Sequence, residues 1–373
     1  MRIGVDARSL SEPISGIGRY TLNLLELMVQ DDSHEWILYS HRPLINGSWN
    51  RKNIKLSNWN LPKSFRVLRM LWAQSILPIM ATIDKVDLFW SPAHRLPRFL
   101  PKSIVSVVTI HDLVWKFAPE TMRPLSQKLD AKLMPEAIKN ADWIIAVSKW
   151  TAKDLIDEVP NAKRKTSIIY EAPSLTYDSI IVKKSLNKNY LLFVGTLEPR
   201  KNLPRLLEAY SFLPSHIKEK YSLNIVGGRG WGEVNFESLI EHFKIKKYVK
   251  ILGYLSDKDL AKTYQNASLL VMPSLYEGFG LPLLEAMNAE VPVVTSNISS
   301  MPEIVGKAAI LVDPYDVNSI KEGMIKVLTD LNLRSSLSKE GLKQSKNFSW
   351  KKAAEKTMLV FTEAISSQQG NNF

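Results

Sequence analysis

The sequence predicts an α/β protein in which two doubly wound domains face a central cleft. Short apolar runs alternate with amphipathic helical stretches along the chain, which is the pattern of strand–helix units in parallel sheets. The length of 373 residues is too great for one ordinary core and fits two domains. Residues 171–189 carry Pro, Ser and Lys with little periodicity, so we expect them to link two halves of similar size.

In the first half, each expected strand is a short apolar run, and Ser148 is the expected N-cap of a helix. After the second strand a polar stretch extends to residue 60. The expected strands are residues 2–6, 36–40, 86–90, 104–110, 142–147 and 166–170, and the expected helices are residues 21–29, 61–80, 126–140 and 151–159.

The second half repeats the same alternation. Ser256 is followed by Asp257 and Asp259, and this spacing indicates a helix N-cap rather than a metal site. The polar tail from residue 366 is expected to fray. The expected strands are residues 190–194, 222–226, 249–252, 268–273, 291–295 and 309–312, and the main expected helices are residues 203–210, 283–289, 317–330, 333–345 and a last one from Trp350 to about Ile365.

Composition narrows the classes of partner and compartment. The net charge of +12 favours anionic partners, but no zinc-ligand pairs or aromatic ribonucleoprotein motif indicates nucleic-acid binding, so lipid head groups and sugar nucleotides remain. No apolar run approaches the ~18 residues of a membrane span, and the start of the chain resembles a strand rather than a signal peptide. With no cysteine, disulfides and thiolate metal sites are excluded, which fits a cytoplasmic protein.

Residues 61–80 form a basic amphipathic pattern with two interpretations. Lys63, Arg66 and Arg69 interleave with apolar side chains, so the helix could dock on the anionic inner face of a membrane as a peripheral protein. The alternative is an ordinary helix whose apolar stripe packs on the sheet while its basic face is solvated, and we favour this second interpretation.

The most informative stretch is residues 274–285, between an apolar strand and a helix. Gly278 and Gly280 allow a sharp turn, and Pro282 suits the first helical position. The N–H groups of the helix beginning near Leu281 would then favour an anion at the carboxyl edge of the sheet. Glu277 and Glu285 bracket this turn, and carboxylates accept hydrogen bonds from sugar hydroxyls. Taken alone, Glu285 could equally be a surface charge that compensates the helix dipole.

The pattern Glu277-Gly278-Phe279-Gly280-Leu281-Pro-x-x-Glu285 resembles the signature of retaining family four glycosyltransferases, which have the GT-B fold. The resemblance implies two Rossmann-like domains, with the two glutamates and the turn between them holding a nucleotide sugar. It implies a first, acceptor-side domain over residues 1–172 completed by a C-terminal helix over 349–373, and a second, nucleotide-sugar domain over 187–348. It also implies that the backbone after the strand 249–252, at Gly253, meets the nucleobase.

Two adjacent cations, Arg200 and Lys201, follow the strand 190–194. Cations oppose the dipole at a helix N-terminus and are costly to leave unpaired, so a diphosphate would satisfy both. The string Gly195-Thr-Leu-Glu-Pro-Arg-Lys-Asn202 resembles the motif in which that family neutralises the leaving nucleotide.

Two first-half motifs also resemble the family. Gly16 and Gly18 lie in a loop between strand and helix, without the ending of a P-loop, and the resemblance places this loop over the donor diphosphate. His111 ends the buried strand 104–110, where α/β enzymes place chemistry. The resemblance places this histidine beside the anomeric carbon of the donor sugar, whereas a lone core histidine would simply be hydrogen-bonded.

These observations lead to one hypothesis and two rivals. The hypothesis is retaining, metal-independent transfer of a hexose from a nucleoside diphosphate sugar to a saccharide or lipid-linked saccharide, with no cofactor. Uridine-linked glucose and guanosine-linked mannose are both open as donors, with a slight preference for the former. A dinucleotide-dependent oxidoreductase is one rival, although the glycines at 227–232 lack the full dinucleotide spacing. A non-catalytic binder of nucleotide sugars is the other.

Overall fold

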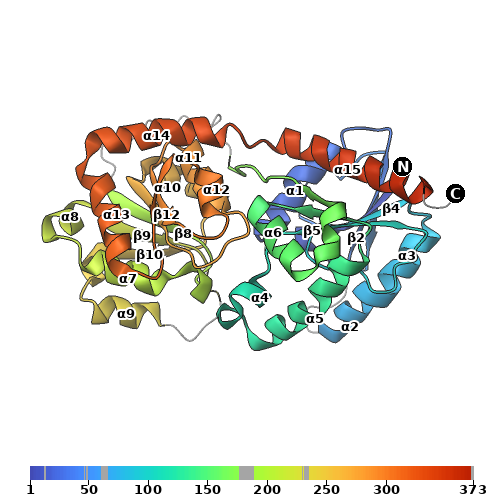
Figure 1. Ribbon diagram of the computed structural model, residues 1–373, viewed down its shortest axis with the longest axis horizontal. Helices are drawn as coiled ribbons and strands as arrows, with labels where there is room; N and C mark the ends of the chain where they lie inside the picture. Colours follow the sequence, from blue (N-terminus) through green and yellow to red (C-terminus); the bar gives the residue numbers. More distant parts are fainter. Residues whose placement is uncertain are drawn as a thin grey trace. The chain divides into compact units, whose positions relative to one another are not determined.

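The computed structural model describes residues 1–11, 14–45, 47, 49–59, 66–175, 189–228, 230 and 235–370. The chain divides into two compact units, each built around its own parallel sheet (Figure 1). Unit 1 comprises Met1–Leu113, Leu129–Glu171 and Ser349–Phe373, and unit 2 comprises Val114–Lys128 and Ala172–Phe348. The segment Val114–Lys128, which the sequence assigns to the first domain, therefore groups with the second unit. Most of the expected linker lies outside the described residues.

Unit 1 contains a seven-stranded parallel sheet in the order β3-β2-β1-β4-β5-β6-β7. One of these strands, β3, falls in the stretch that the sequence left as polar loop. It pairs with β2 from Trp36↔Ile54 onward and forms the sheet edge, where Ile54 and Leu56 alternate with polar side chains and no continuous apolar run marks the strand. The strands are β1 Arg2–Asp6, β2 Glu35–Ser40, β3 Ile54–Asn58, β4 Leu88–Ser91, β5 Val105–Ile110, β6 Trp143–Ala146 and β7 Thr166–Ile168.

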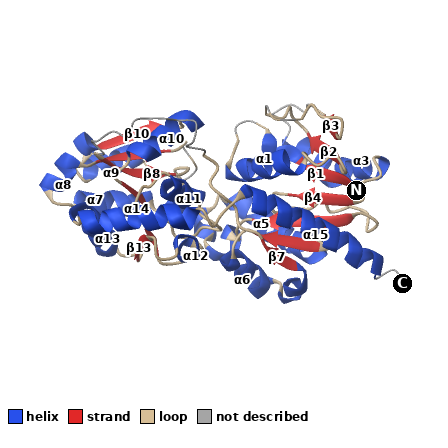
Figure 2. Cartoon of the chain, turned by 90° about the horizontal axis from the view of Figure 1, so that it is seen from above, coloured by secondary structure: helices blue, strands red, loops and turns tan. Residues whose placement is uncertain are grey.

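Helices cover both faces of this sheet (Figure 2). On one face Trp72 and Leu77 pack under Phe89, and on the other Phe361 of α15 packs against Trp90. The long last helix also packs along α1. The helices that lie wholly in unit 1 are α1 Gly16–Met28, α2 Arg66–Leu71, α3 Leu77–Ile83, α6 Lys149–Glu158 and α15 Trp350–Gly370, and α5 Pro124–Asn140 begins in unit 2.

The predicted helix over residues 61–80 is interrupted in the structure. Its described part consists of α2 and α3 with a π-helical segment, Trp72–Ile76, between them, and residues 61–65 lie outside the described chain. The π segment lets Trp72 and Ala73 enter the core while Leu68, Leu71, Ile79 and Ile83 stay exposed. None of the described helices is both long and apolar enough to cross a membrane.

Unit 2 contains a six-stranded parallel sheet in the order β10-β9-β8-β11-β12-β13. The predicted strands of this half are all present, and each of their ends lies within two residues of the prediction. The strands are β8 Tyr190–Val194, β9 Ser222–Val226, β10 Val249–Gly253, β11 Leu269–Met272, β12 Val293–Ser296 and β13 Ala309–Val312. The helices are α4 Val114–Phe117, α7 Leu203–Ser211, α8 Ser215–Lys220, α9 Phe236–His242, α10 Asp257–Asn266, α11 Leu281–Asn288, α12 Met301–Val305, α13 Val317–Thr329 and α14 Leu331–Ser345.

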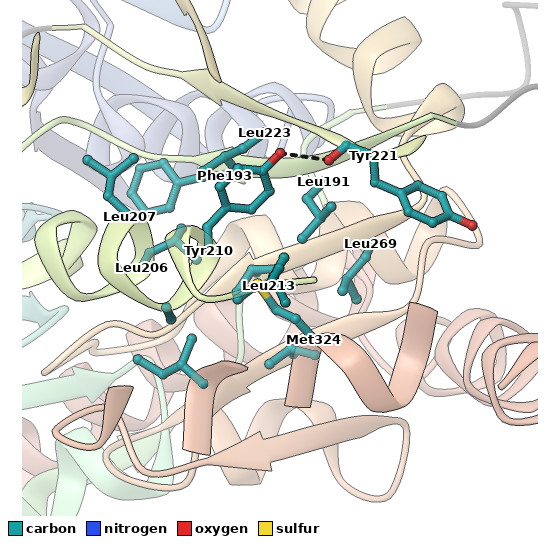
Figure 3. Close-up of a cluster of buried hydrophobic side chains, with 14 of the residues drawn as sticks. Leu191, Phe193, Leu206, Leu207, Tyr210, Leu213, Tyr221, Leu223, Leu269 and Met324 are labelled. Carbon is teal, nitrogen blue, oxygen red and sulfur yellow. Dashed lines mark hydrogen bonds between the residues drawn. The ribbon is translucent and has the colours of Figure 1, made fainter. Parts of the chain in front are cut away.

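The core of unit 2 fixes the strand ends on which the site is built. Leu191 and Phe193 of β8 point into a buried cluster with Leu206 and Leu207 of α7 (Figure 3). The hydroxyl of Tyr210 donates a hydrogen bond of 2.8 Å to the backbone oxygen of Tyr221, so its polar end is satisfied inside this cluster. The position of β8 and of the loop after it is therefore set by dense apolar packing.

Leu206→Ala should lower the free energy of unfolding of unit 2 by about 2–5 kcal/mol, because it removes a fully buried side chain and leaves a cavity. Urea unfolding followed by circular dichroism measures the loss. The matched control is Leu331→Ala. Because Leu331 is 70% exposed, this substitution should change the free energy of unfolding only slightly. Equal losses in both variants would contradict this description of the core.

Candidate active site

The turn between β11 and α11 has the geometry that the glycine pattern predicts, with two adjustments. Gly280 has φ +102° and forms the N-cap of α11, so the left-handed conformation is required at this glycine. Gly278 is not among the residues with positive φ. The helix begins at Leu281, which puts Pro282 one residue further into its first turn than expected.

Two serines that the sequence analysis did not single out hold this turn in place. The Ser299 hydroxyl accepts from the backbone N–H of Glu277 and donates to its carbonyl oxygen, at 3.1 and 2.5 Å. The Ser300 hydroxyl donates to the carbonyl oxygens of Glu277 and Phe279. These serines follow β12, the strand next to β11, so only the sheet order reveals their proximity.

The Glu277 carboxylate lies between the two cations that follow β8. Its Oε2 is 2.5 Å from Nη1 of Arg200, and its Oε1 is 2.6 Å from Nζ of Lys201. Glu277 is 6% exposed and Lys201 is 8% exposed, so the pairing is buried. Arg200 also meets Glu198 through Nη2 at 2.6 Å.

The sequence analysis expected these cations to need an external anion, and the structure corrects that expectation. Two carboxylates, Glu198 and Glu277, already face the two cations. The reason is topological, because β8 and β11 are neighbours in the sheet and the loops after them meet. Glu277 stands 76 residues after Lys201, and no local spacing reveals the contact.

The electrostatics of this cluster follow from its burial. Burial alone would raise the pKa of the Glu277 carboxyl, but the charges of Arg200 and Lys201 outweigh it and lower the pKa to about 2. Glu277 is therefore ionised throughout the neutral range, and its charge balances a cationic pair.

The second glutamate of the pattern, Glu285, is also buried. It is 5% exposed on α11, and its Oε2 accepts a hydrogen bond of 2.9 Å from the hydroxyl of Tyr264 on α10. The interpretation of Glu285 as a solvated surface charge is therefore wrong. Tyr264 gave no signal in the sequence, since it lies on a different helix from Glu285.

A pocket of about 390 Å³ opens at the carboxyl ends of β8, β9 and β10 within unit 2. The sequence analysis expected the backbone near Gly253 to meet a ligand, and Gly253 does line this pocket. The part of its wall that the structure describes consists mainly of apolar side chains and backbone, together with the carboxylate of Glu237. The lining residues are Leu197, Gly227, Gly228, Phe236, Glu237, Ile251, Leu252, Gly253 and Tyr254.

His111 lies in unit 1, immediately after β5. Its Nδ1 is 2.9 Å from Oε1 of Glu171, and its Nε2 is 2.8 Å from the carbonyl oxygen of Pro92. Burial disfavours the charged ring, but the hydrogen bond and charge of Glu171 outweigh it and raise the pKa of His111. Each ring nitrogen has an oxygen within hydrogen-bonding distance, an arrangement that favours the protonated ring.

The two glycines of the first loop differ in their surroundings. A Cβ on Gly18 would lie 2.5 Å from the carbonyl oxygen of Ser9, so this glycine is required by packing. A Cβ on Gly16 would meet nothing within 4 Å among the described residues, so the backbone there is open to a ligand.

Comparisons with known proteins agree with this arrangement. Family models described as Glycosyltransferase Family 4 and Glycosyl transferases group 1 match residues 14–172 and 178–344. The chain is 32% identical to the O-antigen chain mannosyltransferase B of Escherichia coli, over 97% of this chain and 99% of that protein. The chain belongs to glycosyltransferase family 4.

The fold of this glycosyltransferase is GT-B. Sucrose-phosphate synthase from Thermosynechococcus elongatus superimposes with a TM-score of 0.76 at 17% identity, covering 98% of this chain and 100% of that one. Anabaena HepE, solved in complex with UDP and glucose, superimposes with a TM-score of 0.73 at 18% identity over 97% and 100% of the two chains. Membership of this family decides against both rival functions, the oxidoreductase and the non-catalytic binder.

The part of the glycosyltransferase that the structure describes contains no group of three or more His, Cys, Asp or Glu side chains arranged to hold a metal ion. Asp257 and Asp259 occupy the first turn of α10, where the Ser256 hydroxyl accepts from the backbone N–H of Asp259. The prediction that this pair belongs to a helix cap is confirmed.

Replacing Glu277 by Gln should destabilise unit 2 by about 3–5 kcal/mol at pH 7, because two buried cations lose a counter-charge. The pKa of Glu277 is depressed, so its contribution is full above the ordinary value of 4.5 and is lost as the pH falls toward about 2. The difference between wild type and Glu277→Gln in urea unfolding should therefore shrink between pH 7 and pH 3. Glu340→Gln, at an exposed glutamate of the same unit, is the control, and a pH-independent difference would refute the pairing.

Proposed function

We propose that this glycosyltransferase transfers a hexose, with retention of anomeric configuration, from a nucleoside diphosphate sugar to a saccharide or lipid-linked saccharide. The observation that carries the proposal is the buried Glu277 carboxylate between Arg200 and Lys201, beside the N-terminus of α11. Cations and the positive dipole end of a helix together form a field suited to a pyrophosphate.

In this proposal the Glu277 carboxylate neutralises Arg200 and Lys201 while no donor is bound. The incoming pyrophosphate binds Arg200 and Lys201, and the carboxylate then accepts hydrogen bonds from distal hydroxyls of the sugar. The backbone of Gly278, Phe279, Gly280 and Leu281 supplies further N–H donors. Such an exchange avoids any stage at which a buried cation lacks a counter-charge.

The remaining site residues have proposed roles on the same donor. Glu285, fixed by Tyr264, accepts from the ribose hydroxyls. The open backbone at Gly16, with Gly18 shaping the loop, contacts the diphosphate. His111, whose protonated form Glu171 favours, is assigned a place beside the anomeric carbon.

The reaction breaks the bond between the anomeric carbon and the phosphate oxygen, and its electron pair leaves with the nucleoside diphosphate. The acceptor oxygen bonds to the anomeric carbon on the same face, and its proton passes to the departing phosphate. We propose that Arg200, Lys201 and the helix N-terminus supply the positive field for that leaving group without a metal.

Lys201→Ala should lower the turnover number about 100-fold or more, since one preorganised charge contact is worth ~3 kcal/mol. Release of nucleoside diphosphate in the presence of acceptor measures turnover, and circular dichroism confirms folding. Lys307→Ala removes an exposed lysine of the same unit and serves as control. Near-normal transfer by Lys201→Ala would count decisively against the scheme.

We further propose that the sugar is mannose and that the base is guanine, which revises the slight preference for uridine-linked glucose. The full-length relative from Escherichia coli is named a mannosyltransferase. Among the described residues that line the pocket beside Gly253, Glu237 is the one with a carboxylate. Guanine offers two adjacent donor groups, N1–H and N2–H, to a carboxylate, whereas uracil offers one N–H flanked by acceptors.

A panel of donors tests this assignment. Turnover with guanosine-linked mannose should exceed turnover with uridine-linked glucose, and Glu237→Gln should lower kcat/KM for the guanosine donor by about 10- to 100-fold, the value of one bidentate contact. The same substitution should leave the uridine donor nearly unchanged, as should Glu340→Gln for both donors. A preference for uridine-linked glucose that Glu237→Gln does not alter would overturn the assignment.

A further inference from the structure

A second histidine, His94, lies beside His111 in unit 1, and the proposed mechanism does not use it. It stands in the loop that follows β4, at the carboxyl edge of the sheet, where α/β proteins bind ligands. Its backbone N–H donates to the carbonyl oxygen of Thr109 on β5 at 3.0 Å. The rings of the two histidines meet edge to face, with their centroids 5.1 Å apart. A substrate that contacts the ring of His111 would therefore be within reach of His94.

The two histidines differ in the nitrogen atoms that they can offer to a ligand. Both ring nitrogens of His111 are engaged inside the chain, Nδ1 with Glu171 at 2.9 Å and Nε2 with the carbonyl oxygen of Pro92 at 2.8 Å. Nδ1 of His94 accepts a hydrogen bond of 3.3 Å from the backbone N–H of His111, so this nitrogen carries no proton. The neutral ring of His94 then carries its proton on Nε2, which makes no hydrogen bond to any residue that the structure describes. Nε2 is not fully buried, so a ligand can reach it.

The backbone and the charge state of His94 both suit a fixed hydrogen-bond donor. Its backbone has φ +59°, a left-handed conformation that residues other than glycine rarely adopt, and such strained positions cluster at active sites. Burial and the charge of His111 lower the pKa of His94 to about 3, so the ring is neutral at neutral pH. A neutral ring whose Nδ1 is already occupied is not placed to act as a base, but it can donate one hydrogen bond from Nε2.

We propose that His94 binds the acceptor saccharide by donating a hydrogen bond from Nε2 to one of its hydroxyl oxygens. This inference rests on the proposed function, in which the donor sugar lies beside His111 and the acceptor approaches its anomeric carbon. The attacking hydroxyl gives its proton to the departing phosphate, so His94 has no proton to accept and orients the acceptor instead. The hydrogen bond goes to a neighbouring hydroxyl, because donation to the attacking oxygen would make that oxygen a poorer nucleophile.

A pair of substitutions separates this contact from the support that His94 gives to the backbone of His111. His94→Asn keeps an acceptor atom near the position of Nδ1 and tolerates the left-handed conformation, but it loses the Nε2 donor. It should raise the KM for the acceptor about tenfold, the value of one hydrogen bond, and leave the donor KM and donor hydrolysis unchanged. His94→Gln keeps a donating amide near the position of Nε2, so its acceptor KM should lie closer to that of the wild type.

The acceptor in these assays is the alkyl glycoside that is turned over fastest in a panel of mannoside, glucoside, galactoside and N-acetylglucosaminide. Circular dichroism confirms that both variants fold, and His216→Asn, at an exposed histidine of unit 2, is the control. If His94 only held His111 in place, the order would be reversed, with the larger loss in His94→Gln, and that outcome would overturn the proposal. A raised donor KM in His94→Asn would assign the contact to the donor sugar and would reject it equally.

A binding experiment tests the contact without catalysis. The full chain with isotope-labelled histidine is titrated with each glycoside of the panel while UDP and GDP together saturate the donor site. The ring nitrogens of His94 are followed by nuclear magnetic resonance, and their signals are assigned by their loss in His94→Asn. Nε2 should carry the proton, and its signal should move with at least one glycoside while the signals of His216 stay in place. A proton on Nδ1, or no response to any glycoside, would overturn the proposal. If no donor supports transfer or hydrolysis, the proposed function fails, while this titration still decides whether His94 contacts a saccharide.

Discussion

The contact of Glu277 with Arg200 and Lys201 is the interaction on which the second unit depends. It joins the loops after two neighbouring strands, β8 and β11, and it lies where the helix α11 starts. The carboxylate is the shared partner of both cations, so its removal would leave a buried cation without its counter-charge. The pairing therefore depends on one geometry of the surrounding backbone. The strand ends, the two serines that hold the turn and the N-cap at Gly280 together fix that geometry.

That requirement explains why so many polar contacts converge on a short loop. Ser299 and Ser300 fix the backbone of Glu277, and Asn202 donates from its amide to the carbonyl oxygens of Pro273 and Pro314. These bonds hold the loops after β8, β11, β12 and β13 against one another. The carboxylate is thus preorganised, which is how an enzyme orients charge at low cost during the reaction.

The sequence predicted the parts of the fold that a local apolar pattern encodes. The predictions of buried strands such as β5 and β8, and of the turn before α11, were correct. Each of these features is encoded by consecutive residues in the sequence. The edge strand β3 was missed, since its side chains are mostly exposed and polar. The π segment in the predicted helix 61–80 was also missed, because the shift that it causes in the apolar stripe is too small to recognise over so short a stretch.

For the site, too, the sequence predicted motifs of consecutive residues but not contacts between residues far apart in the chain. The pattern from Glu277 to Glu285 and the pair at Arg200 and Lys201 were visible as motifs. Their mutual pairing was not, and the sequence analysis wrongly concluded that the cations await an external partner. Glu171, whose carboxylate favours the protonated form of the His111 ring through a 2.9 Å contact, falls in what the sequence indicated was a linker. Partners 60 or more residues apart become neighbours only through the order of the strands.

The pairing in unit 2 also bears on which ligand suits it. The cations at the carboxyl edge of this unit are matched by Glu198 and Glu277, so an anionic ligand that binds them would have to displace an internal partner. A matched cluster of this kind favours a ligand that offers hydroxyls to the released carboxylate as well as negative charge to the cations, and a sugar diphosphate offers both.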